Sequence, residues 1–430
     1  MKISFYNLGC KVNFAETAQL QENFRKLGFD IVDFGSESDI VLINTCTVTH
    51  KADADSRKII RRAIRQNPQA FIAVGGCYAQ LASELLKDIH GIDALFGANE
   101  KFKINELITD FSKRNNTEVF ISEKPNAEFY PACSADSNLR MRAVLKLQDG
   151  CDYFCTYCAV PHARGKSRSM PFDQIIPYLN NIEDQGYKEV VLTGINLGDY
   201  EYNGKNFADV LHLINRETPG LRIRISSLEP DLINDEIIEA VAHSDFICPH
   251  FHIPLQSGSG EILKNMRRRY DDSFFKLLID KINNNISYCG LGIDVIVGFP
   301  GETDVHFMET FNLLNDLQFS YLHVFSYSDR KVAAASKMPN KISAQVKKER
   351  TKQLLDLSDR KAKEFAEMNI NLVRTIIPET YNNSDKIWTG WTENYIKTVF
   401  QGSKKLTIAP YSIKLLSIND DNSLTGERTK

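Results

Sequence analysis

Three cysteines lie close together in the middle of this 430-residue chain, in the segment Cys151-Asp152-Tyr153-Phe154-Cys155-Thr156-Tyr157-Cys158. Thiolates at this spacing can bind three irons of a four-iron cluster, which leaves the fourth iron without a protein ligand. An open coordination position allows a metal site to take part in catalysis. Zinc is the alternative, although zinc normally has four ligands and the nearest further candidate is His162. The segment therefore predicts a metal centre and favours an iron–sulfur cluster.

A second set of cysteines is spread over the first hundred residues. Cys10, Cys46 and Cys77 each follow a predicted strand, and the strands are at residues 2–8, 39–44 and 70–75. Helical patterns separate these strands, so the segment is expected to form a parallel sheet covered by helices. Ligands of open parallel sheets bind at the carboxyl ends of the strands, where the three cysteines would meet. Buried structural cysteines are the alternative, but that explanation suits one such placement better than three.

The composition is that of a soluble globular protein with two or three domains, because 43% of the residues are hydrophobic and 25% are charged. The apolar runs are far shorter than the roughly 20 residues of a membrane span, and the first residues lack a signal-peptide pattern. We therefore expect a cytoplasmic protein with no membrane partner. In that compartment nine cysteines indicate metal or redox chemistry rather than disulfides. The net charge of −3 gives no overall basic field that would announce a nucleic-acid partner.

The pattern of strands and helices predicts an α/β protein with three domains. Residues 1–112 form the open parallel α/β domain, and the polar segment that follows, 113–138, is expected to be a linker. Residues 139–368 repeat strand and helix six times, with strands at 143–148, 189–193, 222–226, 250–255, 292–297 and 321–326. This predicts a partial (β/α)6 barrel of the TIM type, with its chemistry at the carboxyl ends of the strands. Residues 369–430 have short β segments at 372–377, 396–400, 405–408 and 412–418, which predict a small β-barrel.

The central cysteine segment, placed after the first barrel strand and with Tyr157 before its last cysteine, resembles that of the radical S-adenosylmethionine (SAM) superfamily. Segments at the ends of later strands resemble the SAM-binding elements of that superfamily, such as Leu192-Thr193-Gly194-Ile195-Asn196 and Asp294-Val295-Ile296-Val297-Gly298. The resemblance assigns SAM contacts to seven residues, namely Tyr157, Gly194, Asn196, Ser226, Glu229, Gln256 and Asp294.

Within that superfamily the chain is most similar to the methylthiotransferases. Asn7-Leu8-Gly9-Cys10-Lys11-Val12-Asn13, Asn44-Thr45-Cys46-Thr47-Val48 and Gly75-Gly76-Cys77-Tyr78-Ala79-Gln80 match the three N-terminal cysteine motifs of that family. The segment Gly390-Trp391-Thr392-Glu393-Asn394-Tyr395 looks like part of its TRAM domain, an RNA-binding barrel. Ala163-Arg164-Gly165-Lys166-Ser167-Arg168-Ser169 is most similar to the MtaB-type branch, which methylthiolates threonylcarbamoyladenosine beside the tRNA anticodon.

The resemblance implies a catalytic role for six cysteines in two 4Fe-4S clusters, one on Cys151, Cys155 and Cys158 and the other on Cys10, Cys46 and Cys77. SAM at the first cluster would give the radical that removes hydrogen from carbon 2 of adenine, a C–H bond that acid–base groups cannot activate. The second cluster would carry the sulfur that is methylated and transferred.

The resemblance also implies partners, which are the tRNA anticodon stem-loop, a sulfur donor, and an electron donor of the flavodoxin or ferredoxin type. Arg164 and Arg168 are candidates to bind the carboxylate of the threonylcarbamoyl group, since arginine pairs with carboxylates through two hydrogen bonds. The alternatives are the same chemistry on isopentenyladenosine in tRNA or on an aspartate of a ribosomal protein, and, from another class, a non-catalytic RNA-binding metalloprotein.

Overall fold

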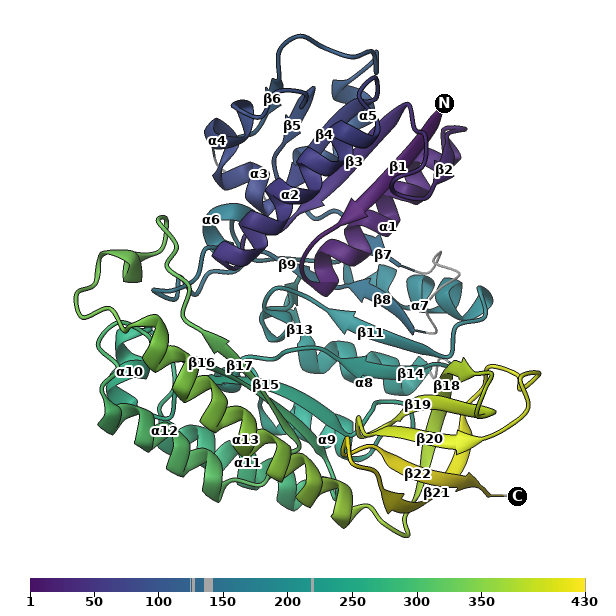
Figure 1. The fold of residues 1–430 in the computed structure, drawn as a ribbon. Coiled ribbons are helices and arrows are strands. Elements are labelled where there is room, and N and C mark those ends of the chain that lie inside the picture. The colour runs from purple at the N-terminus through teal and green to yellow at the C-terminus, as the bar shows by residue number, and fades with distance from the viewer. Residues whose placement is uncertain (124, 126–127, 135–141, 218–219, 430) are drawn as a thin grey trace.

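The computed structural model describes residues 1–123, 125, 128–134, 142–217 and 220–429. The N-terminal sheet, the central strands and the C-terminal β-barrel follow one another along the chain and pack together (Figure 1). The predicted end of the linker at 138 and the predicted start of the central domain at 139 lie outside the described residues. No helix in the described part of the chain is both long enough and apolar enough to cross a membrane.

The N-terminal region forms a parallel sheet with helices on both faces, which confirms the predicted fold class. Its strands, in sheet order, are β2 (Asp30–Val32), β1 (Lys2–Asn7), β3 (Ile40–Thr45), β4 (Phe71–Gly76), β5 (Ala94–Phe96) and β6 (Glu118–Phe120). The helices are α1 (Lys11–Lys26), α2 (His50–Gln66), α3 (Cys77–Leu81), α4 (Ser83–Lys87) and α5 (Ile104–Leu107). One apolar core joins α1 and α5 to the sheet, and another joins α2, α3 and α4 to its opposite face. Burial on both faces explains why β3 and β4 are almost wholly apolar.

The segment predicted to be a linker contains two short strands. The strand β6 extends the N-terminal sheet, and β7 (Ala132–Cys133) pairs antiparallel with the first central strand. Both strands are short and lie at sheet edges, where one neighbour is enough to fix them and the apolar alternation of a central strand is not required.

Six parallel strands form the central partial barrel, as predicted. They are β8 (Arg142–Lys146), β11 (Glu189–Thr193), β14 (Arg222–Ile225), β15 (His250–Gln256), β16 (Gly290–Val297) and β17 (Tyr321–Ser326). Isolated bridges between Ile223 and Ile247 and between Ser227 and His252 join the two halves of this barrel. The main covering helices are α7 (Ile175–Asp184), α8 (Phe207–Glu217), α9 (Asp235–Ala242), α11 (Asp272–Asn285), α12 (Asp304–Asp316) and α13 (Ala344–Met368). The carboxyl ends of the central strands lie on the side of the barrel that faces the N-terminal sheet (Figure 1).

The C-terminal region is a closed five-stranded barrel made of β18 (Val373–Asn382), β19 (Ile387–Thr392), β20 (Lys397–Gln401), β21 (Tyr411–Ile418) and β22 (Leu424–Arg428). The strand predicted at 405–408 is wrong, because that segment forms a turn in which the Leu406 amide donates to the Ser403 carbonyl. The sequence did not reveal β19 and β22, each of which contains a glycine. A side chain at Gly390 would lie 2.3 Å from the Ile377 carbonyl, so the tight barrel requires glycine there.

Candidate active site

The three N-terminal cysteines come together at one edge of the sheet. Cys10 precedes α1 directly, Cys46 follows β3, and Cys77 opens α3, and the strands before them are neighbours in the order β1, β3, β4. Gly9 has a φ of 106°, and a side chain there would lie 2.6 Å from the Cβ atom of Cys46. Only glycine combines this backbone conformation with so close an approach, so the Gly-Cys pair brings Cys10 beside Cys46.

The pKa of the Cys46 thiol is raised to about 11, mainly by burial and to a smaller extent by the neighbouring thiols of Cys77 and Cys10. Burial likewise raises the pKa of Cys77, although the positive charges of Arg164 and Lys101 oppose that effect. Buried thiols that lie close together can bind a metal centre, which takes the place of their protons and shares the charge of the thiolates.

The central cysteines lie on a loop after β9 (Gln148–Asp149) and before α6 (Val160–Arg164). The Tyr153 amide donates to the Cys151 sulfur over 3.4 Å, and the Val160 amide donates to the Cys158 sulfur over 3.4 Å. Burial raises the pKa of Cys151 to about 11 and that of Cys158 to about 12. Backbone donors aimed at sulfur are typical of iron–sulfur sites, where they stabilise the anionic cluster.

Arg268 also belongs to this site, although the sequence showed it only as part of a basic run, Arg267–Arg269. Its guanidinium donates to the Cys155 sulfur over 3.1 Å and to the Tyr157 hydroxyl over 3.2 Å, and it forms an ion pair with Glu229. A basic run after a helix usually indicates a solvated surface, so no sequence signal distinguished this residue. Arg268 therefore joins the cysteine loop to two of the predicted SAM contacts.

A cavity of about 250 Å³ opens beside the cysteine loop. Its lining includes one of the central cysteines, Cys158, and three of the seven predicted SAM contacts, namely Tyr157, Gln256 and Asp294. Gln256 has a φ of 66° at the irregular end of the pairing between β15 and β16. This conformation, rare for a residue other than glycine, is typical of functional sites.

Two more of the predicted SAM contacts carry buried polar atoms without partners. Both side-chain amide atoms of Asn196 and the hydroxyl of Ser226 are buried and make no hydrogen bond within the described residues. Gly194 precedes Asn196 closely, and a side chain there would approach Gln148 to 3.0 Å. Buried polar atoms normally have partners, so these residues fit a polar ligand such as the amino acid part of SAM.

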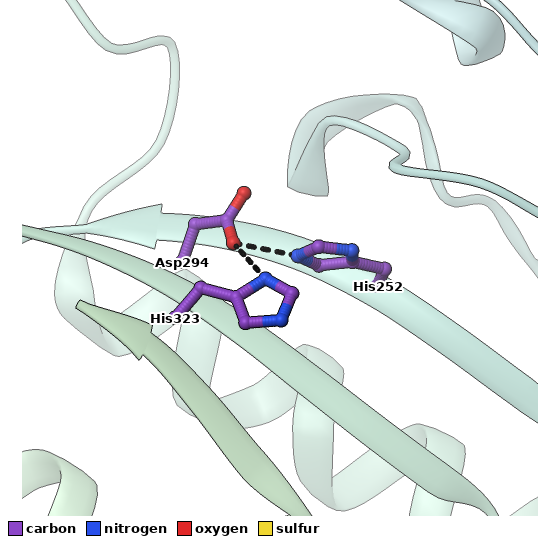
Figure 2. A group of neighbouring side chains, drawn as sticks. All are labelled: His252, Asp294 and His323. Atoms are coloured by element: carbon purple, nitrogen blue, oxygen red, sulfur yellow. Dashed lines mark hydrogen bonds and ion pairs between the residues drawn. The ribbon is translucent and has the colours of Figure 1, made fainter. Parts of the chain in front are cut away.

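Figure 2 shows Asp294 between two histidines on adjacent strands of the central barrel. One oxygen of Asp294 lies 2.6 Å from Nε2 of His252 and 3.1 Å from Nδ1 of His323. Burial would raise the pKa of Asp294, but hydrogen bonds from both histidines hold it at about 2. Asp294 also lines the smaller cavity, whereas the histidines line a larger cavity of about 390 Å³ inside the barrel.

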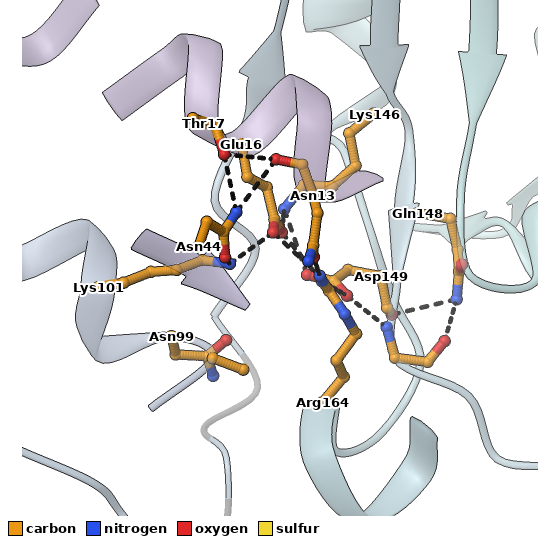
Figure 3. A network of polar contacts seen from close by, with 12 residues as sticks. Asn13, Glu16, Thr17, Asn44, Asn99, Lys101, Lys146, Gln148, Asp149 and Arg164 are labelled. Carbon is orange, nitrogen blue, oxygen red and sulfur yellow. Dashed lines mark hydrogen bonds and ion pairs between the residues drawn. The ribbon is translucent and has the colours of Figure 1, made fainter. Parts of the chain in front are cut away.

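The predicted substrate contacts, Arg164 and Arg168, both join a polar network between the N-terminal sheet and the barrel, and Figure 3 shows Arg164 within it. Arg164 is 1% exposed and donates to Glu16 over 2.9 and 3.0 Å and to Asp149 over 2.8 Å. Arg168 donates to Asp149 over 3.0 Å and to the Glu128 carbonyl. Because both guanidinium groups have partners within the protein, this geometry favours a structural role, and contact with the substrate stays a prediction.

The comparisons with known proteins agree with this geometry. Residues 145–314 match the model of the radical SAM superfamily, and residues 2–97 match "Uncharacterized protein family UPF0004". The chain is 41% identical to the threonylcarbamoyladenosine tRNA methylthiotransferase MtaB of Bacillus subtilis, over 96% of this chain and 93% of the relative. This chain belongs to the radical SAM tRNA methylthiotransferase family. Another methylthiotransferase of the same name, from Aquifex aeolicus, is 35% identical over 94% of this chain and 98% of its own length.

A methylthiotransferase named for another substrate is about as similar to this chain as the Aquifex aeolicus enzyme. The tRNA-2-methylthio-N(6)-dimethylallyladenosine synthase of Fusobacterium nucleatum is 32% identical over 94% of both chains. Among solved structures, the radical SAM methyltransferase TsrM of Kitasatospora setae has a TM-score of 0.53 at 14% identity and covers 75% of this chain and 72% of its own. The cobalamin-dependent radical enzyme OxsB also has a TM-score of 0.53, at 16% identity, over 85% of this chain and 56% of its own. These two structures share the fold of this chain.

Proposed function

We propose that this protein converts N6-threonylcarbamoyladenosine at position 37 of tRNA, next to the anticodon, to its 2-methylthio derivative. The observation that carries the proposal is the near full-length identity of 41% with the MtaB enzyme of Bacillus subtilis, combined with one three-cysteine set at the strand ends of the N-terminal sheet and another on the loop between β9 and α6. Because tRNA is the substrate, we expect the reaction to take place in the cytoplasm.

The first cofactor would be a 4Fe-4S cluster held by Cys151, Cys155 and Cys158, with SAM in the adjoining cavity. When bound there, cluster and SAM supply a carbon radical, which can remove hydrogen from an unreactive C–H bond. The chain provides the surroundings of this chemistry: Arg268 donates to Cys155, and Asn196 and Ser226 offer unpaired polar atoms to SAM. An electron donor is required, and a flavodoxin or ferredoxin is the class that we expect.

The second cofactor would be a 4Fe-4S cluster on Cys10, Cys46 and Cys77. The charges around this set support it, because Arg164 and Lys101 lie close enough to Cys77 to act on it. They belong to a buried network of four cations, Lys101, Lys146, Arg164 and Arg168, whose ion-pair partners among the described residues are the two acids Glu16 and Asp149. An excess of buried positive charge is costly unless an anion balances it, and a thiolate-bound cluster is such an anion. A sulfur donor would supply this cluster.

The roles of the three regions follow from these assignments. We propose that residues 1–112 carry the second cluster, that 139–368 carry the first cluster with SAM, and that 369–430 form a TRAM-like module that binds RNA. Base modification requires a nucleotide that can leave its stack, and the bases of an anticodon loop can be splayed out in this way.

Isopentenyladenosine is the second candidate substrate, and the 32% identity to the dimethylallyladenosine enzyme supports it. The substrates differ in one property that the protein can recognise, since threonylcarbamoyl is polar and carries a carboxylate whereas isopentenyl is apolar. Mass spectrometry of tRNA nucleosides from a strain that lacks threonylcarbamoyladenosine methylthiolation, with and without this gene, tests the proposal. Gain of the 2-methylthio threonylcarbamoyl nucleoside is expected, and gain of only the isopentenyl product would contradict it.

A further inference from the structure

The lining of the larger cavity includes three cationic and three imidazole side chains. It encloses about 390 Å³ within the central barrel, a volume in the range of roughly 300–1,000 Å³ that small-molecule sites occupy. Its charged and titratable lining residues are Lys11, Arg142, Arg224, His250, His252, His323 and Glu379, with Tyr321 and Tyr395 beside them. Only one of these residues is an acid, so the cavity is suited to an anionic ligand.

Most of these groups already have partners within the protein. Arg142 forms an ion pair with Glu379 over 2.8 Å, and Arg224 donates to Glu189 over 2.8 Å and to two backbone carbonyls of the C-terminal barrel. His252 and His323 share the carboxylate of Asp294 (Figure 2). These groups shape the cavity and make it cationic, but their hydrogen-bonding capacity is largely used.

Lys11 is different, because its ammonium group makes no hydrogen bond or ion pair with any residue that the structure describes. It follows Cys10 directly at the start of α1, and its side chain reaches the cavity from the N-terminal sheet. Arg142, Arg224 and Asp294 are among the charges close enough to act on it. Nδ1 of His250, buried and also without a partner, lines the same cavity. The hydroxyl of Ser226, buried and without a partner, lines it as well, so the cavity combines one unpaired cation with two polar atoms that lack partners.

We propose that this cavity is a carboxylate-binding subsite in which Lys11 pairs with the threonyl carboxylate of the modified adenosine. The inference rests on the proposed function and deepens it. Lys11 follows Cys10 directly in the chain. Binding of the substituent by Lys11 would therefore position the adenosine close to the second cluster, which Cys10 would hold. Lys11 is exposed in the free protein, so a bound carboxylate would gain a charge-assisted hydrogen bond from its ammonium group, whereas an apolar isopentenyl group would gain none.

Equilibrium binding tests this subsite separately from turnover. Full-length protein with reconstituted clusters and SAM, without reductant, is titrated with three anticodon stem-loops that carry threonylcarbamoyladenosine, its methyl ester, or plain adenosine. The wild type is expected to bind the acid about 10- to 100-fold more tightly than the ester, the effect of one charge-assisted hydrogen bond. Lys11→Gln should bind acid and ester alike, and Lys11→Arg should restore most of the difference.

Lys26→Gln is the matched control, since Lys26 ends the same helix and is exposed, paired only with Glu22 over 3.6 Å. It should keep the wild-type ratio between acid and ester. Three results would overturn the subsite: a ratio unchanged in Lys11→Gln, an equal loss for all three RNAs with a weaker salt dependence, or a loss of iron from Lys11→Gln. If the ratio is unchanged in Lys11→Gln but the wild type still forms methylthio product, the subsite is refuted and the proposed function is not. A wild type that neither discriminates among the RNAs nor forms product refutes both.

Discussion

At the scale of single residues, the two cysteine sets should have separable roles. Reconstituted wild-type protein is expected to hold about eight irons, as two four-iron clusters. Replacing Cys151, Cys155 and Cys158 with alanine should halve the iron content and abolish cleavage of SAM to deoxyadenosine. Replacing Cys10, Cys46 and Cys77 should also halve the iron but leave deoxyadenosine formation largely intact and remove methylthio product. Iron near four in the wild type would contradict the second cluster.

Arg268 offers a second test at this scale, because it donates to a cluster cysteine without being a ligand. Hydrogen bonds and positive charge near the sulfurs stabilise the reduced, more negative cluster. Arg268→Gln should therefore lower the reduction potential of the central cluster at unchanged iron content, as measured by a redox titration followed by electron paramagnetic resonance. Arg269→Gln is the neighbouring control, since Arg269 lies over the Tyr153 ring rather than at a sulfur. Equal potentials in the wild type and Arg268→Gln would contradict this role.

At the scale of elements, the sequence predicted most strands of the sheets and where their carboxyl ends meet, because β-branched and apolar runs alternate there with amphipathic helices. It therefore placed Cys10, Cys46 and Cys77 at one edge of the N-terminal sheet, where the structure has them. It did not reveal contacts between elements far apart in the sequence: Arg268 was only part of a basic run, and Arg164 was assigned to the substrate although it is 1% exposed. Such contacts depend on how distant elements pack, which local periodicity does not record. The prediction missed strands β19 and β22 for a related reason. Their glycines are required by the close packing of a small barrel, which local sequence patterns do not reveal.

The attachment of the C-terminal barrel gives a prediction at this scale. Glu189 on β11 pairs with Arg222 and Arg224 on β14, and these arginines donate to carbonyls of Thr375, Trp391, Thr392 and Glu393 in the C-terminal barrel. Glu189→Gln leaves two buried arginines without their acid, which typically costs about 3–5 kcal/mol. Unfolding in urea should show this loss at pH 7, and the transition should begin in the C-terminal barrel, as followed by Trp388 and Trp391 fluorescence.

The pH dependence of that loss follows from the pKa of Glu189. Burial would raise this pKa, but Arg222 and Arg224 hold it at about 2, below its ordinary value of 4.5. A depressed pKa in the folded state stabilises the protein above pH 4.5, and this contribution falls as the pH drops from 4.5 towards 2. The difference between wild type and Glu189→Gln should therefore shrink by about 1 kcal/mol between pH 4.5 and pH 3.5. A difference independent of pH over this range would contradict the assigned pKa.

At the scale of the whole molecule, one buried network holds the N-terminal sheet against the barrel. Glu16 on α1 contacts Lys101 over 2.6 Å within its own domain, and Lys146 and Arg164 of the barrel, both over 2.9 Å (Figure 3). The three cations hold the pKa of Glu16 well below its usual range even though burial opposes this. Arg164 of this network also acts on Cys77, and Asp149 lies two residues before Cys151, so we expect the network to set how the two cysteine sets lie relative to each other.

Glu16→Gln should therefore impair the coupling of the two sites more than either site alone. Loss of the central carboxylate takes the acid from Lys101 and leaves Lys146 and Arg164 to share Asp149, so about 3–5 kcal/mol of stability should be lost. We expect deoxyadenosine formation to persist, since the cysteine loop and SAM cavity belong to the barrel, whereas methylthio product per deoxyadenosine should fall at least tenfold. Glu22→Gln is the control, because Glu22 lies on the same helix in surface ion pairs with Arg25 and Lys26, which contribute roughly 0–1 kcal/mol. If Glu16→Gln lowered both products in the same proportion, the network would support the fold as a whole and not the registration of one cluster against the other.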